Sequence, residues 1–510
     1  MPLSRRRFLV DATLSMAALP LALRAQPASG PAPGAFQHGV ASGDPLGDRV
    51  ILWTRVTPAP DGTGPIRVRW RIGTDERVTH VVARGTAEAT ADRDFTVKVD
   101  AAGLTPGRTY YYVFDALGAP SPIGRTRTLP EPGISRLRLG IVSCSNYPAG
   151  YFNVYRCLAN RPDLDAIVHL GDYIYEFANG AYGDGLTSGR VPKPSTEAAT
   201  LADYRLRYGT YRTDIDLQEA HRLHPFIAVW DDHESANDSG PAGAVGHSSK
   251  DGDWATRFAA AYRAYLEWMP VREPRETGIR LYRTFHFGTL ADLVMVDTRG
   301  LRDRRVAASS AELSASTRSI LGAGQEAWLA GELRASQRAG TQWRLLGQQV
   351  LFTSVTPPML PVQNVDVWDG YPAARARVYD MLARERVTNL AILTGDLHSS
   401  WALEVPKNPW SSSGSPDLDP VAVELVTPAI SSPPLFETAS IRDTAPLLRL
   451  AARHLKYLEG ESRGYVLLDI TAERLRTEWY HVPNVTERRP LERQAAAFVV
   501  ERGSPRLLPG

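Results

Sequence analysis

Cysteine is nearly absent from the 510-residue chain, which has only Cys144 and Cys157. Small secreted proteins held together by disulfides carry many more, so that class of scaffold is excluded. A long hydrophobic run is also missing after residue 25, and we expect no stable membrane anchor. Neither sign of charge dominates, since 58 Lys and Arg accompany 56 Asp and Glu. This balance argues against nucleic-acid binding by bulk charge.

Residues 1–25 resemble a twin-arginine signal peptide. Arg5–Leu9, an arginine run followed by Phe-Leu, precedes a short apolar stretch over 12–23, and Ala25 is a suitable cleavage point. This pattern favours the twin-arginine export machinery, which carries folded proteins. The alternatives are a general secretory signal or a disordered basic end. We therefore expect a periplasmic or secreted protein.

The next region, residues 36–130, consists of short β runs between turn signals. Period-two alternation, as in 66–72, is typical of half-buried strands. The segment 104–114 is a turn followed by an aromatic strand, and it resembles the corner of a fibronectin type III sandwich, where a tyrosine ties back to the turn. We predict an N-terminal fibronectin III-like β-sandwich over 36–130, after a linker at 26–35.

From 137 to 490, apolar runs alternate with helical stretches, which predicts a layered α/β catalytic domain. The runs are 137–144, 164–172, 226–232, 291–297 and 390–396, and a helix is expected over 254–269. Each of these runs ends in a carboxylate or a thiol. Because α/β sheets build their sites at the carboxyl ends of strands, we expect these side chains to form the functional site.

The segment 171–175 is the clearest candidate. Gly171 lets the Asp172 carboxylate approach a cation without steric obstruction, and Tyr175 can face the same point from a tight turn. A phenolate oxygen is a hard ligand that suits a trivalent ion better than zinc. The alternative is a turn aspartate beside two packing tyrosines.

Three further strand ends carry ligand-type side chains. Asp232 could bind a metal while the neighbouring His233 meets substrate, and Asp396 and His398 lie two residues apart. A Cys144 thiolate would add a soft ligand to hard ones, a mixture that points to iron. The alternatives are a structural histidine and, for Cys144, a buried thiol or a disulfide with the second cysteine.

In chain order the motifs are Cys144, Gly171-Asp-x-x-Tyr175, Asp232-His-Glu234 and Gly395-Asp-x-His398. Together they resemble the PhoD-like alkaline phosphatases, relatives of purple acid phosphatases and of calcineurin-like metallophosphoesterases. The resemblance implies a layered metallophosphoesterase-type β-sandwich flanked by helices, preceded by the all-β domain.

The resemblance also implies an Fe³⁺/Ca²⁺ site. Cys144, Asp172 and Tyr175 would hold Fe³⁺ together with His398, and Asp172 would bridge to a Ca²⁺ that Asp232 and Asp396 also bind. Purple acid phosphatases have Asn and His where this chain has Asp232 and Asp396. Since calcium takes oxygen ligands, these replacements favour calcium over zinc. The roles of Gln348 and Arg299, which lie in further family-like segments, stay open.

The implied activity is hydrolysis of small-molecule or phospholipid phosphate esters, monoesters or diesters, by a metal-bound hydroxide. His233 would stabilise charge or protonate the leaving oxygen. The alternatives are a phospholipase D-type phosphodiesterase and a non-catalytic exported surface-binding protein. A zinc alkaline phosphatase with a serine nucleophile is a further alternative, which a phosphorylated serine would reveal.

Overall fold

The computed structural model describes residues 34–274, 278–357, 364–437 and 450–510, with Val362, Pro446 and Leu448. The expected signal peptide, residues 1–25, lies outside the described residues. Within the described ranges, every helix is too short or too polar to span a bilayer.

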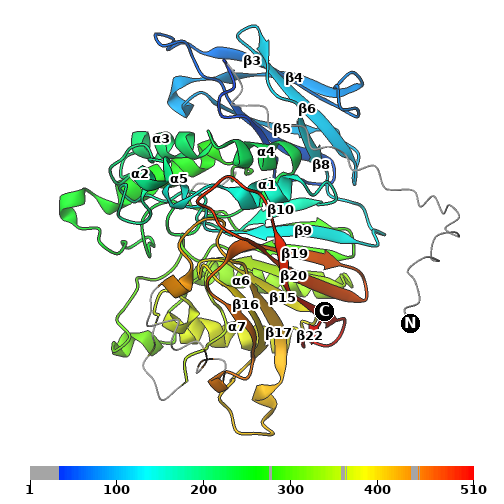
Figure 1. Ribbon diagram of the computed structural model, residues 1–510. Helices are drawn as coiled ribbons and strands as arrows, with labels where there is room; N and C mark the ends of the chain where they lie inside the picture. Colours follow the sequence, from blue (N-terminus) through cyan, green and yellow to red (C-terminus); the bar gives the residue numbers. More distant parts are fainter. Residues whose placement is uncertain are drawn as a thin grey trace, which may run out of the picture.

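The described strands form three sheets, which Figure 1 shows stacked along the long axis of the molecule. The five-stranded sheet consists of β4 (Val81–Ala89), β3 (Ile66–Gly73), β6 (Thr109–Ala116), β7 (Ala119–Pro120) and β8 (Gly124–Arg127). The ten-stranded sheet runs β22 (Leu508–Pro509), β21 (Arg493–Glu501), β20 (Arg474–Val482), β19 (Arg463–Ile470), β9 (Leu137–Val142), β10 (Ala166–His169), β11 (Pro225–Ala228), β1 (Val40–Gly43), β2 (Arg49–Arg55) and β5 (Thr96–Ala102). The seven-stranded sheet runs β12 (Arg283–Phe287), β13 (Ala291–Met295), β14 (Trp343–Gln348), β15 (Leu390–Thr394), β17 (Pro420–Val426), β16 (Ser400–Pro406) and β18 (Leu455–Glu459).

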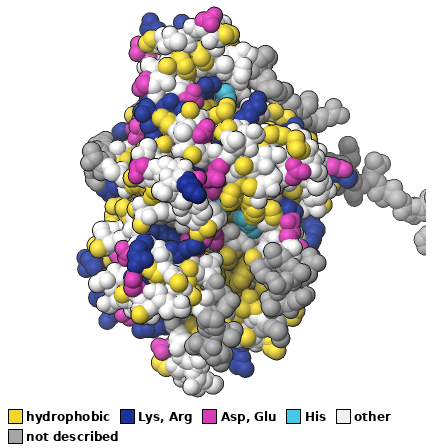
Figure 2. All heavy atoms as spheres, turned by 90° about the vertical axis from the view of Figure 1, so that its left-hand side faces the viewer, with side chains coloured by type: hydrophobic (Ala, Val, Ile, Leu, Met, Phe, Trp, Pro, Cys, Tyr) yellow, Lys and Arg dark blue, Asp and Glu magenta, His cyan; other side chains and the backbone are white. Residues whose placement is uncertain are grey.

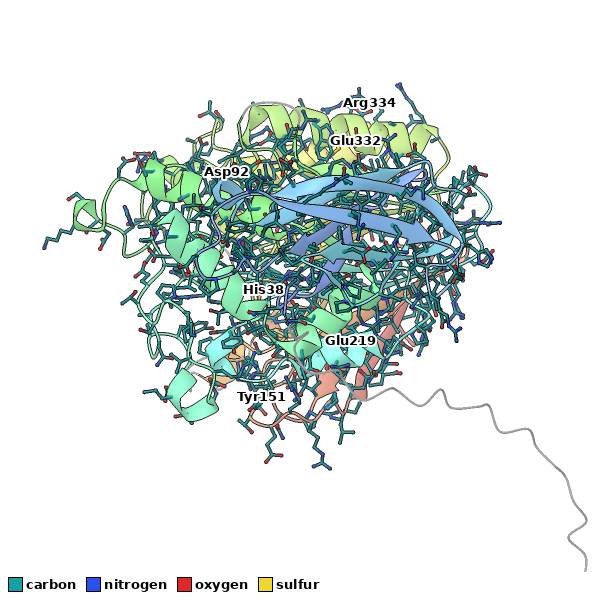
Figure 3. All side chains as sticks on the ribbon, turned by 90° about the horizontal axis from the view of Figure 1, so that it is seen from above. His38, Asp92, Tyr151, Glu219, Glu332 and Arg334 are labelled. Carbon is teal, nitrogen blue, oxygen red and sulfur yellow. The ribbon has the colours of Figure 1, made fainter. Side chains whose placement is uncertain are left out.

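Helices cover the outer faces of the two larger sheets. They are α1 (Asn153–Ala159), α2 (Gly185–Ser188), α3 (Leu201–Tyr211), α4 (Ile215–Leu223), α5 (Trp254–Trp268), α6 (Gly322–Arg338) and α7 (Pro372–Arg384). The helix expected over 254–269 is α5, which Asp253 caps by accepting the Thr256 N–H at 2.8 Å and which ends before Pro270. Seen from above, the five-stranded sheet lies between α6, with Glu332 and Arg334, and α4, with Glu219 (Figure 3).

The two larger sheets pack face to face. Ile141 of β9 and Val168 of β10 belong to one apolar cluster with Leu293 of β13 and Leu345 of β14. A second cluster packs α6 and α7 against the other face of the seven-stranded sheet. The predicted layered sandwich with flanking helices is therefore confirmed.

The N-terminal region is all-β, as predicted, and its corner is formed by Tyr110. The Tyr110 hydroxyl accepts the Thr105 N–H at 2.8 Å and so ties β6 back to the preceding turn. This region also contributes β1, β2 and β5 to the ten-stranded sheet, because β1 pairs in parallel with β11 through Ser42 and Pro225. The change of residue pattern between 130 and 137 therefore divides the chain but does not divide the sheet.

Candidate metal centre

The predicted site residues meet where neighbouring parallel strands end. β9, β10 and β11 are parallel neighbours in one sheet, and β13, β14 and β15 are parallel neighbours in the other. A bridge between Ser143 and Ala429 joins the two sheets at this edge. Three groups of potential metal ligands result: Cys144, Asp172 and His398; Asp172, Asp232 and His233; and Asp231, Asp232 and Asp396. Within each group the ligand atoms lie within 4.8 Å of one another.

Four of the predicted ligands have left-handed backbones. The φ angles are 64° at Cys144, 56° at Asp172, 62° at Asp396 and 49° at His398. For residues with a Cβ this conformation costs on the order of 1–3 kcal/mol each, and it turns the side chain sharply away from the strand direction. Gly171 also has positive φ, at 109°, and a Cβ there would lie 2.4 Å from the Asp231 Cβ. The glycine is thus required for both its conformation and its close approach.

The first ligand group is compact, with Cys144 and Asp172 buried and His398 half-buried. Tyr175 joins it, because its hydroxyl lies 2.9 Å from Asp172 Oδ2 and 3.1 Å from His398 Nε2. Burial, reinforced by the Asp172 carboxylate, raises the pKa of both the Cys144 thiol and the Tyr175 phenol well above their usual values. These groups would have to ionise to bind a metal, so a cation at this point would offset the repulsion between them. The structure brings together all four residues predicted to hold iron.

His398 is oriented for ligation through Nε2. Its Nδ1 lies 2.9 Å from the Pro433 carbonyl oxygen, which can only accept, so Nδ1 carries the proton and the Nε2 lone pair points toward the Tyr175 hydroxyl. Burial lowers the pKa of His398 to about 4, which keeps the ring neutral, as a metal ligand must be. Tyr182 packs beside the ring with its hydroxyl 3.0 Å from Nδ1.

Asp172 and Asp232 link the three groups. Asp172 belongs to the first two and Asp232 to the last two, so a single set of carboxylates spans the site. Burial raises the pKa of Asp172 and of Asp396 well above the usual value, and neighbouring carboxylates add to the shift. The Asp231 Oδ2 atom is buried and makes no hydrogen bond. Such a concentration of carboxylate oxygen suits a hard divalent cation.

His233, the predicted catalytic residue, lies at the edge of the second group. Its Nε2 is 3.8 Å from Asp232 Oδ2, and its Nδ1 is 2.8 Å from Glu176 Oε2. Burial by itself would lower the pKa of His233, but the carboxylates of Asp232, Glu176 and Asp172 outweigh it and raise the pKa well above the usual value. These carboxylates therefore favour the protonated imidazole.

Several site residues were not identified from the sequence. Glu176 follows Tyr175 directly, and Glu234 ends the Asp-His-Glu motif, so their positions offered a signal. Glu234 Oε2 accepts the N–H groups of Asp172 at 3.1 Å and Asp231 at 2.7 Å, which holds two ligand loops together. Asp366, far along the chain from these motifs, gave no such signal.

Two open questions from the sequence are answered by side-chain contacts. Gln348 is buried, donates to the Thr394 hydroxyl at 2.7 Å and accepts the Trp368 Nε1–H at 3.0 Å, so its amide is used within the core. Cys144 and Cys157 are both free and buried, and the alternative of a disulfide between them is not realised.

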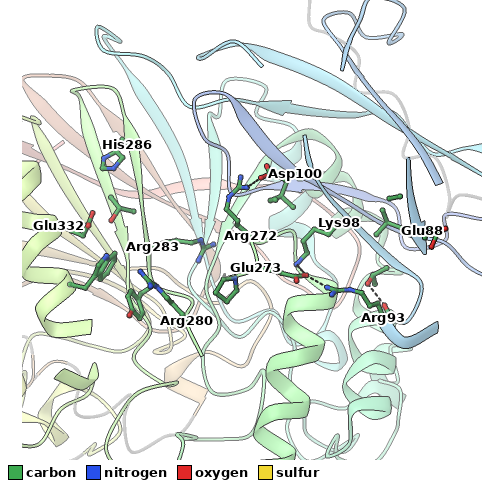
Figure 4. A pocket seen from close by; sticks show the side chains of 18 residues that line it. Glu88, Arg93, Lys98, Asp100, Arg272, Glu273, Arg280, Arg283, His286 and Glu332 are labelled. Atoms are coloured by element: carbon green, nitrogen blue, oxygen red, sulfur yellow. Dashed lines mark hydrogen bonds and ion pairs between the residues drawn. The ribbon is translucent and has the colours of Figure 1, made fainter. Parts of the chain in front are cut away.

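A cavity of about 940 Å³ lies away from this centre, between β5, residues 272–274 and 280–286, and α6 (Figure 4). Several of its charged side chains pair with one another: Glu273 with Arg93 and Lys98, and Asp100 with Arg272. On the face shown in Figure 2, acidic and histidine side chains instead lie at a hollow with Lys and Arg side chains beside it.

Known proteins share both regions of this chain. Family models match at residues 139–479, described as PhoD-like phosphatase, and at 22–130, described as the N-terminal domain of PhoD-like phosphatase. Alkaline phosphatase D of Bacillus subtilis (strain 168) is 34% identical over 486 residues, covering 92% of this chain and 81% of that protein. A solved structure titled "Structure of PhoD" superposes with a TM-score of 0.84 at 32% identity, over 95% of this chain and 93% of that one. The chain therefore belongs to the PhoD-like phosphatases, a family of metal-dependent hydrolases of phosphate esters.

Proposed function

We propose that this protein is an exported phosphate-ester hydrolase whose centre holds one Fe³⁺ and one Ca²⁺. The cluster of Cys144, Asp172, Tyr175 and His398 is the observation that carries this proposal. It places a buried thiol beside a phenol, a carboxylate and an oriented imidazole. Thiolate and phenolate together suit Fe³⁺ better than zinc, magnesium or calcium.

The second cation is proposed to be Ca²⁺, held by Asp172, Asp232 and Asp396. These side chains offer oxygen alone, and calcium binds oxygen ligands almost exclusively. Asp172 could contribute to both cation positions, since it lies in one ligand group with Cys144 and His398 and in another with Asp232. The third group adds the Asp231 carboxylate close by.

The chain's own residues then act on a phosphate ester bound against the cations. Cations at such a site acidify water and neutralise phosphate charge when they are bound. The protonated His233 donates from Nε2 to the leaving oxygen, while Glu176 holds the opposite nitrogen and keeps the ring in position. The buried surroundings exclude bulk water from these groups.

The substrate is proposed to be a small-molecule or phospholipid ester, either a monoester or a diester, delivered to a protein exported by the twin-arginine machinery. A centre that releases an alcohol from phosphate can act on either ester type. A phospholipase D-type diesterase is the second candidate. A non-catalytic surface-binding protein would leave the strained and buried ligand cluster without a role.

Metal analysis of protein purified without chelators tests the proposal. We expect iron and calcium in comparable amounts, visible absorption from thiolate and phenolate bound to Fe³⁺, and hydrolysis of chromogenic monoesters or diesters. A colourless, fully active preparation containing only zinc would overturn the metal assignment. Trapping of a labelled phosphoserine during turnover would instead support the serine-nucleophile mechanism.

A further inference from the structure

Arg299 is a completely buried cation placed among four carboxylates of the metal centre. Its side chain is 0% exposed and follows the end of β13. Nε pairs with Asp231, and Nη1 lies 2.5 Å from Asp366 Oδ2. Nη2 lies 3.2 Å from Asp232 Oδ1 and 3.6 Å from Asp396 Oδ1. Two of the guanidinium nitrogens therefore anchor it, and the third forms ion pairs, without hydrogen-bond geometry, with two predicted calcium ligands.

The backbone that carries Arg299 is also fixed. The Asp297 carboxylate accepts the N–H groups of Arg299 at 2.9 Å and Gly300 at 2.7 Å. Thr298, which precedes Arg299, donates its hydroxyl to Gln349 Oε1 at 2.6 Å. The guanidinium thus has little freedom to follow a carboxylate that moves, and instead sets where the carboxylates lie.

Arg302, three residues further on, provides an internal comparison. It is equally buried and shares Asp366, with Nη2 2.6 Å from Oδ1. Its Nε donates to the Tyr371 hydroxyl at 3.0 Å. Arg302 and Arg299 are thus matched in burial, in charge and in one partner. Arg302 pairs with Asp366 and Tyr371, whereas Arg299 also reaches Asp232 and Asp396.

We propose that Arg299 is a positioning residue, whose guanidinium, anchored by Asp231 and Asp366, holds the carboxylates of Asp232 and Asp396 in the orientation that receives the second cation. This inference rests on the proposed calcium site. The planar fork of arginine is necessary because one group must meet several carboxylates at fixed angles, which the compact ammonium of lysine cannot do. Residues that orient metal ligands typically contribute about 10–100-fold to metal affinity.

The substitution Arg299→Lys separates positioning from simple electrostatics. It keeps the positive charge, so charge alone predicts unchanged cation affinity, whereas loss of the fork predicts weaker binding. Arg299→Gln sharpens the contrast, because removing a positive charge beside a cation site relieves Coulomb repulsion and should tighten binding. If orientation dominates, that variant also binds calcium more weakly.

The experiment is calorimetric titration of Ca²⁺ into protein treated with a calcium-selective chelator that leaves the iron in place. We expect about 10-fold or greater loss of calcium affinity in Arg299→Lys and Arg299→Gln, and a change below about 3-fold in the matched control Arg302→Lys. Visible absorption should be unchanged in all three variants, because the proposed iron ligands do not contact Arg299.

Each alternative result is informative. Calcium affinity in both Arg299 variants equal to or tighter than that of the unaltered protein overturns the positioning role and leaves the proposed function intact. Failure of the unaltered protein to bind calcium overturns the calcium assignment and the positioning role with it. Thermal unfolding is measured alongside, and if Arg299→Gln does not fold, the Arg299→Lys and Arg302→Lys pair decides the question.

Discussion

Replacing Glu176 by glutamine should move the pH dependence of activity through His233. The Glu176 Oε2 atom lies 2.8 Å from His233 Nδ1, and both side chains are buried. Two unit charges about 4 Å apart at an effective dielectric constant of about 20 attract by about 4 kcal/mol, which corresponds to about 3 pKa units. The carboxylates of Asp232 and Asp172 remain in the variant and continue to raise the pKa. We therefore expect Glu176→Gln to lower the pKa of His233, because one of the carboxylates that raise it is removed.

The sign follows from the role of the protonated ring. The folded-state pKa of His233 lies above its usual value, so the imidazolium persists above pH 6.5 and is lost only as pH rises through that raised pKa. In Glu176→Gln the proton is lost at lower pH, and the alkaline limb of the kcat/KM profile should move to lower pH by about 1–3 units. The acid limb should stay in place.

The assay is kcat/KM for a chromogenic phosphate ester across the pH range, with Glu219→Gln as the control. Glu219 is also a paired glutamate, but its partner is Arg222 on α4. An alkaline limb that coincides in Glu176→Gln and the unaltered protein would refute the assignment of His233 as the proton donor. A shift of equal size in Glu219→Gln would show that the effect is not specific to the pair.

Three further predictions concern the metals and the packing around them. Cys144→Ser should abolish activity and visible colour. Cys157→Ser should retain activity and colour but lower the unfolding free energy by about 1–3 kcal/mol, because it buries a hydroxyl. Equal effects of the two changes on the absorption spectrum would contradict the ligand role of Cys144. A calcium-selective chelator should remove activity and added calcium should restore it, while activity indifferent to this treatment would count against an oxygen-only second site. Gly171→Ala should lower the unfolding free energy by about 2–6 kcal/mol in denaturant titration. The new Cβ would lie 2.6 Å from the Asp231 backbone nitrogen, at a residue whose φ is 109°. The control Gly331→Ala, which adds a Cβ in open space on α6, should have little effect or stabilise.

The strands and the side chains near their ends could be predicted from the sequence because both depend on short stretches of neighbouring residues. The run 164–172 was predicted as a strand that ends in a carboxylate; β10 occupies Ala166–His169, and Asp172 follows it three residues later. The aromatic segment at 104–114 likewise predicted the corner that Tyr110 forms. An alternating or continuous apolar pattern predicts a strand. The residues that follow the strand then lie at the edge of the sheet where its carboxyl ends meet.

The sequence by itself therefore determined the class of fold, and it named six candidate ligands and a candidate proton donor whose roles stay predictions. Only the tertiary structure decided which side chains support them. Asp366 and Arg299 are 67 residues apart and meet because β13 ends beside the loop before α7. The tertiary structure also made β1 a neighbour of β11, so the N-terminal region extends the sheet of the site. Such contacts depend on how sheets stack and which strands pair at long range, and no local pattern of apolar and polar residues encodes that choice.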